Sequence, residues 1–127
     1  MAPAAFRGDY QSFKRSIIGQ ESGGRYGVVN TQGSGAMGIG QIMPATAQTL
    51  AQRAGLSYRP DLMGGSTPEA QAYQNQITEG AAREAWDFGG GDVRKAAHYY
   101  FGGSDQAKWG RKTRKYGNDI VRRMGGS

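Results

Sequence analysis

Residues 6–24 read FRGDYQSFKRSIIGQESGG, and residues 35–44 read GAMGIGQIMP. The first stretch carries apolar residues at helical spacing: Phe6, Tyr10, Phe13 and Ile17. This spacing predicts a helix with one buried face. The glycine pair after Ser22 stops that helix. Glu21 is therefore predicted in or just after its last turn, facing a glycine-rich loop.

Start and stop signals predict four more helices. Pro44 is well placed as a first helical residue, Gly55 as a stop, and Asp92 as an N-cap. Gly80 suggests close packing by a neighbouring helix. The predicted helices are residues 44–54, 67–88, 93–101 and 113–124. Residues 25–42 are predicted as a long loop with a small hairpin, 56–66 as a loop, 1–5 as a loose lead-in and 125–127 as a tail.

Together these signals predict one mainly α domain over residues 1–127. We expect a compact bundle of about five or six short helices, in which the Gly-rich loop or small hairpin forms a substrate cleft. The length of 127 residues fits one domain of ordinary size.

Composition narrows the classes of function. Sixteen basic against ten acidic residues give a net charge of +6, which suits an anionic partner. The alternative is a solvated basic last helix that keeps the domain soluble. With no cysteine and one histidine, we expect no metal site and no cofactor. No apolar run is long enough for a signal peptide or a membrane span, so delivery by a virion, or excision from a larger protein, is expected.

Carboxylate chemistry is the most plausible chemistry for these residues. His98 lacks a nucleophile motif and is expected to pack on its helix. The glycines of 33–40 are not followed by the lysine of a phosphate loop. Among the acids, Glu84 is assigned to a polar helix face, whereas Glu21 is flanked by small residues. Burial against the loop would raise the pKa of Glu21 and keep it protonated. The alternative is a surface glutamate, with Ser22 capping a turn.

Four motifs, in order, resemble those of the soluble lytic transglycosylase (SLT) family. They are Glu21-Ser22, residues 35–47 (GAMGIGQIMPATA), residues 96–102 (AAHYYFG) and residues 113–116 (TRKY). The resemblance covers most of the chain, and its second motif is the most specific. It implies a lysozyme-like α+β fold and cleavage of the β-1,4 bond between N-acetylmuramic acid and N-acetylglucosamine in peptidoglycan.

The resemblance also implies roles for individual residues. Glu21 would be the single acid/base, and Ser22 would orient its neighbourhood. The other implied substrate-binding or supporting residues are Gln41, Met43, Tyr99, Tyr100 and Tyr116. Tyr99 occupies a family position whose hydroxyl approaches the catalytic carboxyl. Tyr100 and Phe101 stand where the family has asparagine and alanine, so the sequence departs from the family there and adds bulk where a small amide usually sits.

A single carboxylate suffices if the sugar supplies the second group. Ordinary glycosidases use two carboxylates about 5–9.5 Å apart, and no acid follows Glu21 before Asp61. The acetamido group of the muramic acid would replace the second carboxylate in stabilising the anomeric carbon. Its 6-hydroxyl would replace water as the nucleophile and leave a 1,6-anhydro end. A carboxylate supplied by Asp61 or Asp92 would permit hydrolysis instead, as in goose-type lysozymes.

Two further classes of function stay open. One is a non-catalytic wall-binding module, and the weaker one is a nucleic-acid-binding domain, for which the last helix offers only scattered cations. Peptidoglycan strands are the expected partner, with no nucleic acid, and the isolated domain is expected to be a monomer within a larger virion or secretion assembly. Some aromatic residues are expected to face sugars, drawn from Tyr26, Tyr58, Tyr99, Tyr100 and Trp109.

Overall fold

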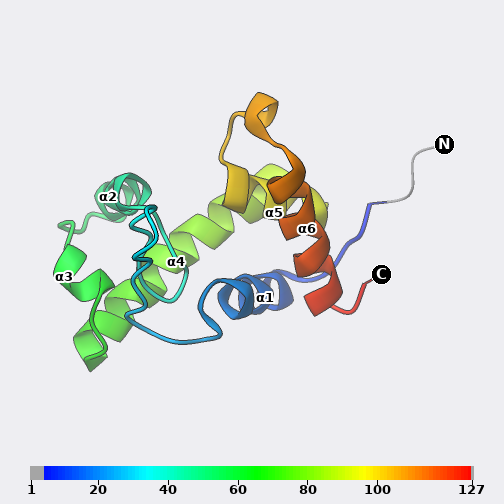
Figure 1. Ribbon diagram of the computed structural model, residues 1–127. Helices are drawn as coiled ribbons and strands as arrows, with labels where there is room; N and C mark the ends of the chain where they lie inside the picture. The colour runs from blue at the N-terminus through cyan, green and yellow to red at the C-terminus, as the bar shows by residue number, and fades with distance from the viewer. Residues whose placement is uncertain (1–4, 127) are drawn as a thin grey trace. The chain divides into compact units, whose positions relative to one another are not determined.

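The computed structural model describes residues 5–126, which are mainly α-helical, as the sequence predicts (Figure 1). This part of the chain contains six α-helices and a short 3-10 helix. They are α1 (Tyr10–Ser22), α2 (Pro44–Arg53), α3 (Pro60–Met63), α4 (Pro68–Gly89), α5 (Val93–Gly102), η1 (Gln106–Lys108) and α6 (Arg111–Arg123). Most of the predicted lead-in 1–5 and the last residue of the predicted tail 125–127 lie outside the described residues.

The chain divides into two compact units. The terminal unit comprises the described residues up to Gln20 and from Ala82 onward, and the loop unit is Glu21–Ala81. Helices α1 and α4 each contribute residues to both units. The prediction of one domain over residues 1–127 stays a prediction.

The core of the terminal unit is built from the apolar faces of α1, α5 and α6 and from the part of α4 that begins at Ala82. Phe13, Ile17, Val93 and Ile120 are fully buried in it. Figure 1 shows α6 running alongside α5. Gly117 allows this close approach, because a Cβ atom there would lie 2.5 Å from the Nε2 atom of His98.

Helix α1 begins later than its apolar spacing predicts. Phe6 lies outside the helix, which starts at Tyr10. Asp9 is the reason, because its carboxylate accepts a hydrogen bond from the Ser12 backbone N–H at 2.9 Å and so caps the helix. Phe6 still packs against the core of the terminal unit as a partly buried side chain.

The loop unit packs α2, α3 and the first part of α4 against the Gly-rich segment. Its buried apolar residues are Ala36, Ile39, Ile42, Ala47, Leu50, Ala51, Met63, Ala70, Tyr73 and Ile77. A Cβ atom on Gly80 would lie 3.3 Å from Leu50 Cδ2, which confirms the predicted close approach to α4. Ala54, the C-cap of α2, is exposed.

Two local features differ from or refine the predicted loops. Residues 60–63 form α3, a single turn begun by Pro60 and too short for hydrophobic periodicity to reveal. Residues 25–42 form the expected small hairpin, reduced to isolated antiparallel bridges of Met37 with Val29 and with Ile42.

Candidate active site

Glu21 lies in the last turn of α1 and is half-buried. The next residue, Ser22, is only 3% exposed. Its hydroxyl donates a 2.7 Å hydrogen bond to the Ile39 carbonyl oxygen and accepts one from the Gly24 N–H at 3.2 Å. The backbone next to Glu21 is therefore fastened to the middle of the Gly-rich segment.

Gln74, on α4, fixes the other side of that segment and was not identified from the sequence. Its side chain is fully buried. Its Oε1 atom accepts hydrogen bonds from the N–H groups of Gly27 and Ile39, both at 3.0 Å. Its Nε2 atom donates to the carbonyl oxygens of Leu62 and Gly65, both at 2.7 Å. One amide thus joins the Gly-rich segment to α3 and the loop after it.

Gly38 makes this arrangement possible. Its φ of +84° lies in the left-handed region, which glycine adopts without strain. A Cβ atom there would also lie 3.1 Å from Gln74 Oε1. A polar residue on the inward stripe of α4, between Tyr73 and Ile77, is the sequence signal that could have pointed to Gln74.

Gln41 and Met43 follow in the same segment. Gln41 has a φ of +50°, a conformation that is uncommon for a residue other than glycine and marks functional loops. Its Nε2 atom donates to the carbonyl oxygens of Val28 at 2.9 Å and Gly38 at 3.1 Å. Within residues 5–126 its Oε1 atom makes no hydrogen bond. Met43, just before α2, is 46% exposed. In the described residues the Gln41 amide oxygen thus has no hydrogen-bond partner, and the Met43 side chain reaches solvent.

Tyr99 belongs to the terminal unit, and its hydroxyl donates a 2.6 Å hydrogen bond to Glu84 Oε1. Its ring packs on Phe88, with the centroids 4.4 Å apart. The assignment of Glu84 to a polar helix face was wrong, because this side chain is half-buried against α5. Phe88, one turn further along α4, is the sequence signal that this face is covered.

Tyr100 and Tyr116 also lie in the terminal unit. Tyr100 is half-buried against its core, and Tyr116 is 6% exposed. Phe101 stacks on the Tyr116 ring at 4.9 Å and is itself 46% exposed. Of these two residues, the Tyr100 side chain packs against the core, whereas the Phe101 side chain lies at the surface.

The structure places the predicted site residues in both units. Glu21, Ser22, Gln41 and Met43 lie in the loop unit, and the three tyrosines lie in the terminal unit.

Two of the other aromatic residues considered for sugar contacts, Tyr26 and Trp109, have hydrogen-bond partners within their own units. The Tyr26 hydroxyl donates to Asn75 Oδ1 at 2.9 Å, and the Trp109 indole donates to the Gly103 carbonyl oxygen at 2.9 Å. Partial burial raises the pKa of Tyr58. The two hydrogen bonds hold the Tyr26 and Trp109 side chains in place. Sugar binding by any of these three residues stays a prediction.

The two acids considered as second carboxylates have other partners. Asp61 forms a two-pronged ion pair with Arg59, at 3.0 and 2.8 Å, which holds the pKa of its carboxyl below the usual value. Asp92 caps α5 by accepting from the Lys95 N–H at 3.2 Å. Each carboxylate thus has a partner close to it in the chain.

His98 packs edge-on against Trp109, with the ring centroids 5.3 Å apart. Burial, and then the charge of Arg94, lower its pKa below 6.5. A lowered pKa means that the unfolded chain binds the proton more readily, so stability is present above about pH 6.5 and falls as the pH drops below it. His98 is the sole histidine, so NMR titration of the imidazole reports it directly. A midpoint at or above 6.5 would contradict this assignment.

The sequence model of the transglycosylase SLT domain family matches residues 4–120. The chain is also 40% identical over 96 residues to a protein named transglycosylase from Enterobacteria phage PRD1. That alignment covers 74% of this chain and 30% of the phage protein. No helix among the described residues has the length and apolar character needed to cross a membrane. With the family match spanning nearly the whole chain, the protein belongs to the transglycosylase SLT domain family.

Proposed function

We propose that this chain is a peptidoglycan lytic transglycosylase that cleaves the bond from N-acetylmuramic acid to N-acetylglucosamine, with Glu21 as its single acid/base. One observation carries the proposal: the half-buried carboxyl of Glu21 ends α1, and the adjacent Ser22 hydroxyl is bonded to the Gly-rich segment, in a chain of this family. This attachment fixes the backbone that carries the carboxyl, and general acid catalysis requires a positioned donor.

The proposed reaction takes two steps. Glu21 first donates its proton to the glycosidic oxygen, and the carbonyl oxygen of the 2-acetamido group stabilises the positive anomeric carbon as the bond breaks. The Glu21 carboxylate then accepts the proton of the sugar's own 6-hydroxyl, whose oxygen attacks the anomeric carbon and closes the 1,6-anhydro ring. Glu21 ends protonated, as it began. The internal hydroxyl is favoured over water because it is already held beside the reacting carbon.

Two observations support the single-carboxylate route. Asp61 and Asp92, the acids considered for a hydrolytic role, are held by Arg59 and by the start of α5. Gln41 retains an Oε1 atom that can accept a hydrogen bond from a sugar amide or hydroxyl, next to the exposed Met43 side chain. In this proposal the loop unit contributes the Glu21 carboxyl, the Gln41 amide oxygen and the exposed Met43 side chain.

The products of digestion test this function. Purified sacculi incubated with the chain should release fragments with 1,6-anhydromuramic ends, which mass spectrometry finds lighter by one water than reducing ends. Reducing ends throughout would instead assign a lysozyme-type hydrolase. No release, with retained binding to sacculi, would assign a wall-binding module.

The phage relative supports a proposal about where the chain acts. We propose that it opens peptidoglycan at the cell wall as part of a virion, since it is 40% identical over 96 residues to a phage PRD1 protein named transglycosylase. The chain spans only about 30% of the length of that protein. The net charge of +6 would favour approach to an anionic wall in a salt-sensitive manner.

Tyr99 gives a prediction that separates chemistry from substrate binding. Tyr99 stands at a position that the family resemblance links to catalysis, so we expect Tyr99→Phe to lower kcat roughly tenfold with little change in KM. The size follows from the loss of one hydrogen bond to a charged group, which is worth about 1.5–3 kcal/mol. Glu84→Gln keeps an acceptor for the Tyr99 hydroxyl and should cost less. In a double-mutant cycle the two effects should not add. A rise in KM alone, on digests of soluble glycan strands, would assign Tyr99 to substrate binding instead.

A further inference from the structure

The turn that follows Ser22 brings Arg25 back to the end of α1. Gly23 and Gly24 both lie in the left-handed region, with φ values of +67° and +82°, which glycine adopts without strain. As a result, the Arg25 backbone N–H and its side-chain Nε–H both donate to the Ser22 carbonyl oxygen, at 3.4 and 2.9 Å. Ser22 directly follows Glu21 in the helix. The turn therefore fastens the Arg25 guanidinium to the residue next to the proposed acid, within the same unit.

The outer nitrogens of Arg25 are available to a ligand. Within residues 5–126 its side chain donates a hydrogen bond through Nε alone and forms no ion pair. The residue is exposed. A guanidinium carries further N–H donors on Nη1 and Nη2, so these point to no acceptor in the described part of the chain. They suit an oxyanion that approaches from solvent.

Arg25 also stabilises the end of α1. The helix has no basic residue in its own last turn, and a cation near a helix C-terminus interacts favourably with the helix dipole. Its Nε–H satisfies the Ser22 carbonyl, one of the last carbonyl groups that have no partner inside the helix. This capping role uses Nε and leaves Nη1 and Nη2 unused, so capping alone does not account for the whole guanidinium.

The surface at this turn is open. A Cβ atom built on Gly23 or on Gly24 would meet nothing within 4 Å beyond its neighbours in the chain, and both residues are exposed. A substituent of a bound substrate thus has room beside the turn, close to a cation that has no anionic partner in the described residues.

We propose that Arg25 binds a carboxylate of the peptide carried by the muramic acid whose bond Glu21 cleaves. The inference rests on the proposed function, because that sugar bears its peptide on the carbon two positions from the anomeric carbon. The fork of Nη1 and Nη2 matches the planar carboxylate with two parallel hydrogen bonds. Arg25 would therefore be a specificity-determining residue, which favours strands with acidic peptides over strands with neutral ones.

Kinetics on two matched soluble strands test this role. One strand has its native peptides, and the other has the same peptides with their carboxyls amidated. We expect the wild-type KM to be about fivefold lower for the native strand, the upper end for an exposed ion pair, with similar kcat. Arg25→Gln should raise KM for the native strand alone and so abolish the preference. Loss of helix capping would change both substrates alike, so the ratio of the two KM values reports the peptide contact.

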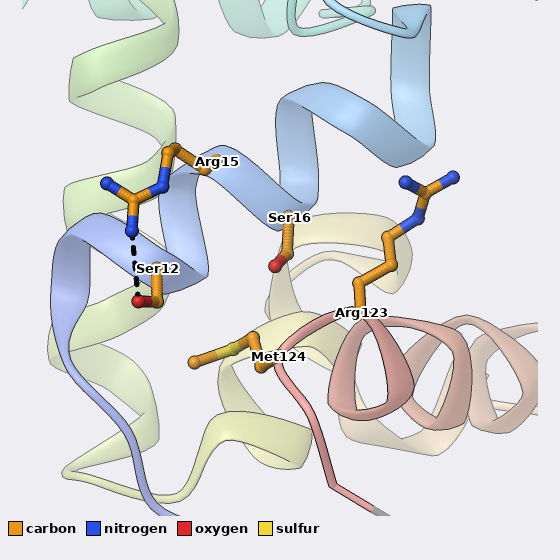
Figure 2. Close-up of a pocket in the computed structure, with 5 residues that line it drawn as sticks. All are labelled: Ser12, Arg15, Ser16, Arg123 and Met124. Atoms are coloured by element: carbon orange, nitrogen blue, oxygen red, sulfur yellow. Dashed lines mark hydrogen bonds between the residues drawn. The ribbon is translucent and has the colours of Figure 1, made fainter.

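Arg15→Gln is the matched control. Arg15 is another exposed arginine of α1 without an ion pair in the described residues, and its guanidinium donates to Ser12 Oγ at 3.3 Å. Figure 2 shows it at the edge of a pocket of about 330 Å³ in the terminal unit, with the bond to Ser12 dashed. Arg15→Gln should keep the full preference for the native strand. An equal loss in Arg15→Gln, a preference retained by Arg25→Gln, or no preference in the wild type would each overturn the proposal.

Two further arms separate the alternatives. Strands freed of their peptides by an amidase carry the lactyl carboxylate instead, and wild type and Arg25→Gln should have equal KM values for them. A higher KM for Arg25→Gln on these strands would assign the lactyl group and overturn the peptide assignment. Reducing ends among the products would refute the single-carboxyl mechanism and leave the KM comparison valid. If neither strand is cleaved, dissociation constants of the two intact strands, measured by calorimetry, provide the same comparison.

Discussion

Glu21→Gln is expected to lower the rate of sacculus digestion by at least about a hundredfold, the smallest effect usual for removal of a general acid. Glutamine keeps the size of the side chain and its place at the end of α1, but it cannot donate a proton to the glycosidic oxygen. Release of soluble muropeptides from purified sacculi measures the loss. Sedimentation with intact sacculi should be unchanged, because the carboxyl serves the chemistry and not the attachment.

A matched change controls for the loss of an acidic group. Glu69 lies exposed in the first turn of α4, in the same unit as Glu21. Glu69→Gln should digest sacculi at the wild-type rate. Near-normal digestion by Glu21→Gln would remove Glu21 from the mechanism. If Glu21→Gln binds sacculi normally but no longer digests them, the chain is not a purely wall-binding module.

Gln74→Met is expected to lower the free energy of unfolding by about 3 kcal/mol or more. Methionine has a similar length but makes none of the four hydrogen bonds of Gln74. A buried group that loses its partner costs about 1–3 kcal/mol. Urea denaturation measures the change. At a temperature where the variant is fully folded, kcat should also fall. Without Gln74, Ile39 loses one of the bonds that hold it, and its carbonyl oxygen is the acceptor for the Ser22 hydroxyl next to Glu21.

Thr78→Val provides the control for Gln74→Met. Thr78 lies one turn further along α4 and is 1% exposed. In the described part of the chain its hydroxyl has no hydrogen-bond partner. Valine keeps the shape and removes a buried polar group, so stability should be unchanged or slightly higher. If both variants lose stability equally, general repacking of α4, and not the Gln74 bonds, explains the effect.

The helices could be predicted because their signals are local. Apolar spacing, Pro44 and Asp92 mark α1, α2 and α5 without reference to the rest of the chain. The start of α1 was misjudged because Phe6 continues the apolar spacing while Asp9 caps the helix three residues later. A single turn such as α3 leaves no periodic pattern to detect.

The candidate site was predicted in its motifs but not in the contacts that support them. Glu21 and Ser22 stand at the helix end where the sequence placed them. Gln74 and Glu84 were missed because their partners, Ile39 and Tyr99, are 35 and 15 residues away in the chain. Sequence pattern shows that such a side chain is polar, whereas only the fold shows which group it bonds.

Digestion in water labelled with heavy oxygen tests the central claim most directly, because it asks which oxygen reaches the anomeric carbon. If Glu21 activates the sugar's own 6-hydroxyl, the new muramic ends are anhydro and contain no label. Labelled reducing ends would show that water is the nucleophile, and would contradict the single-carboxyl mechanism.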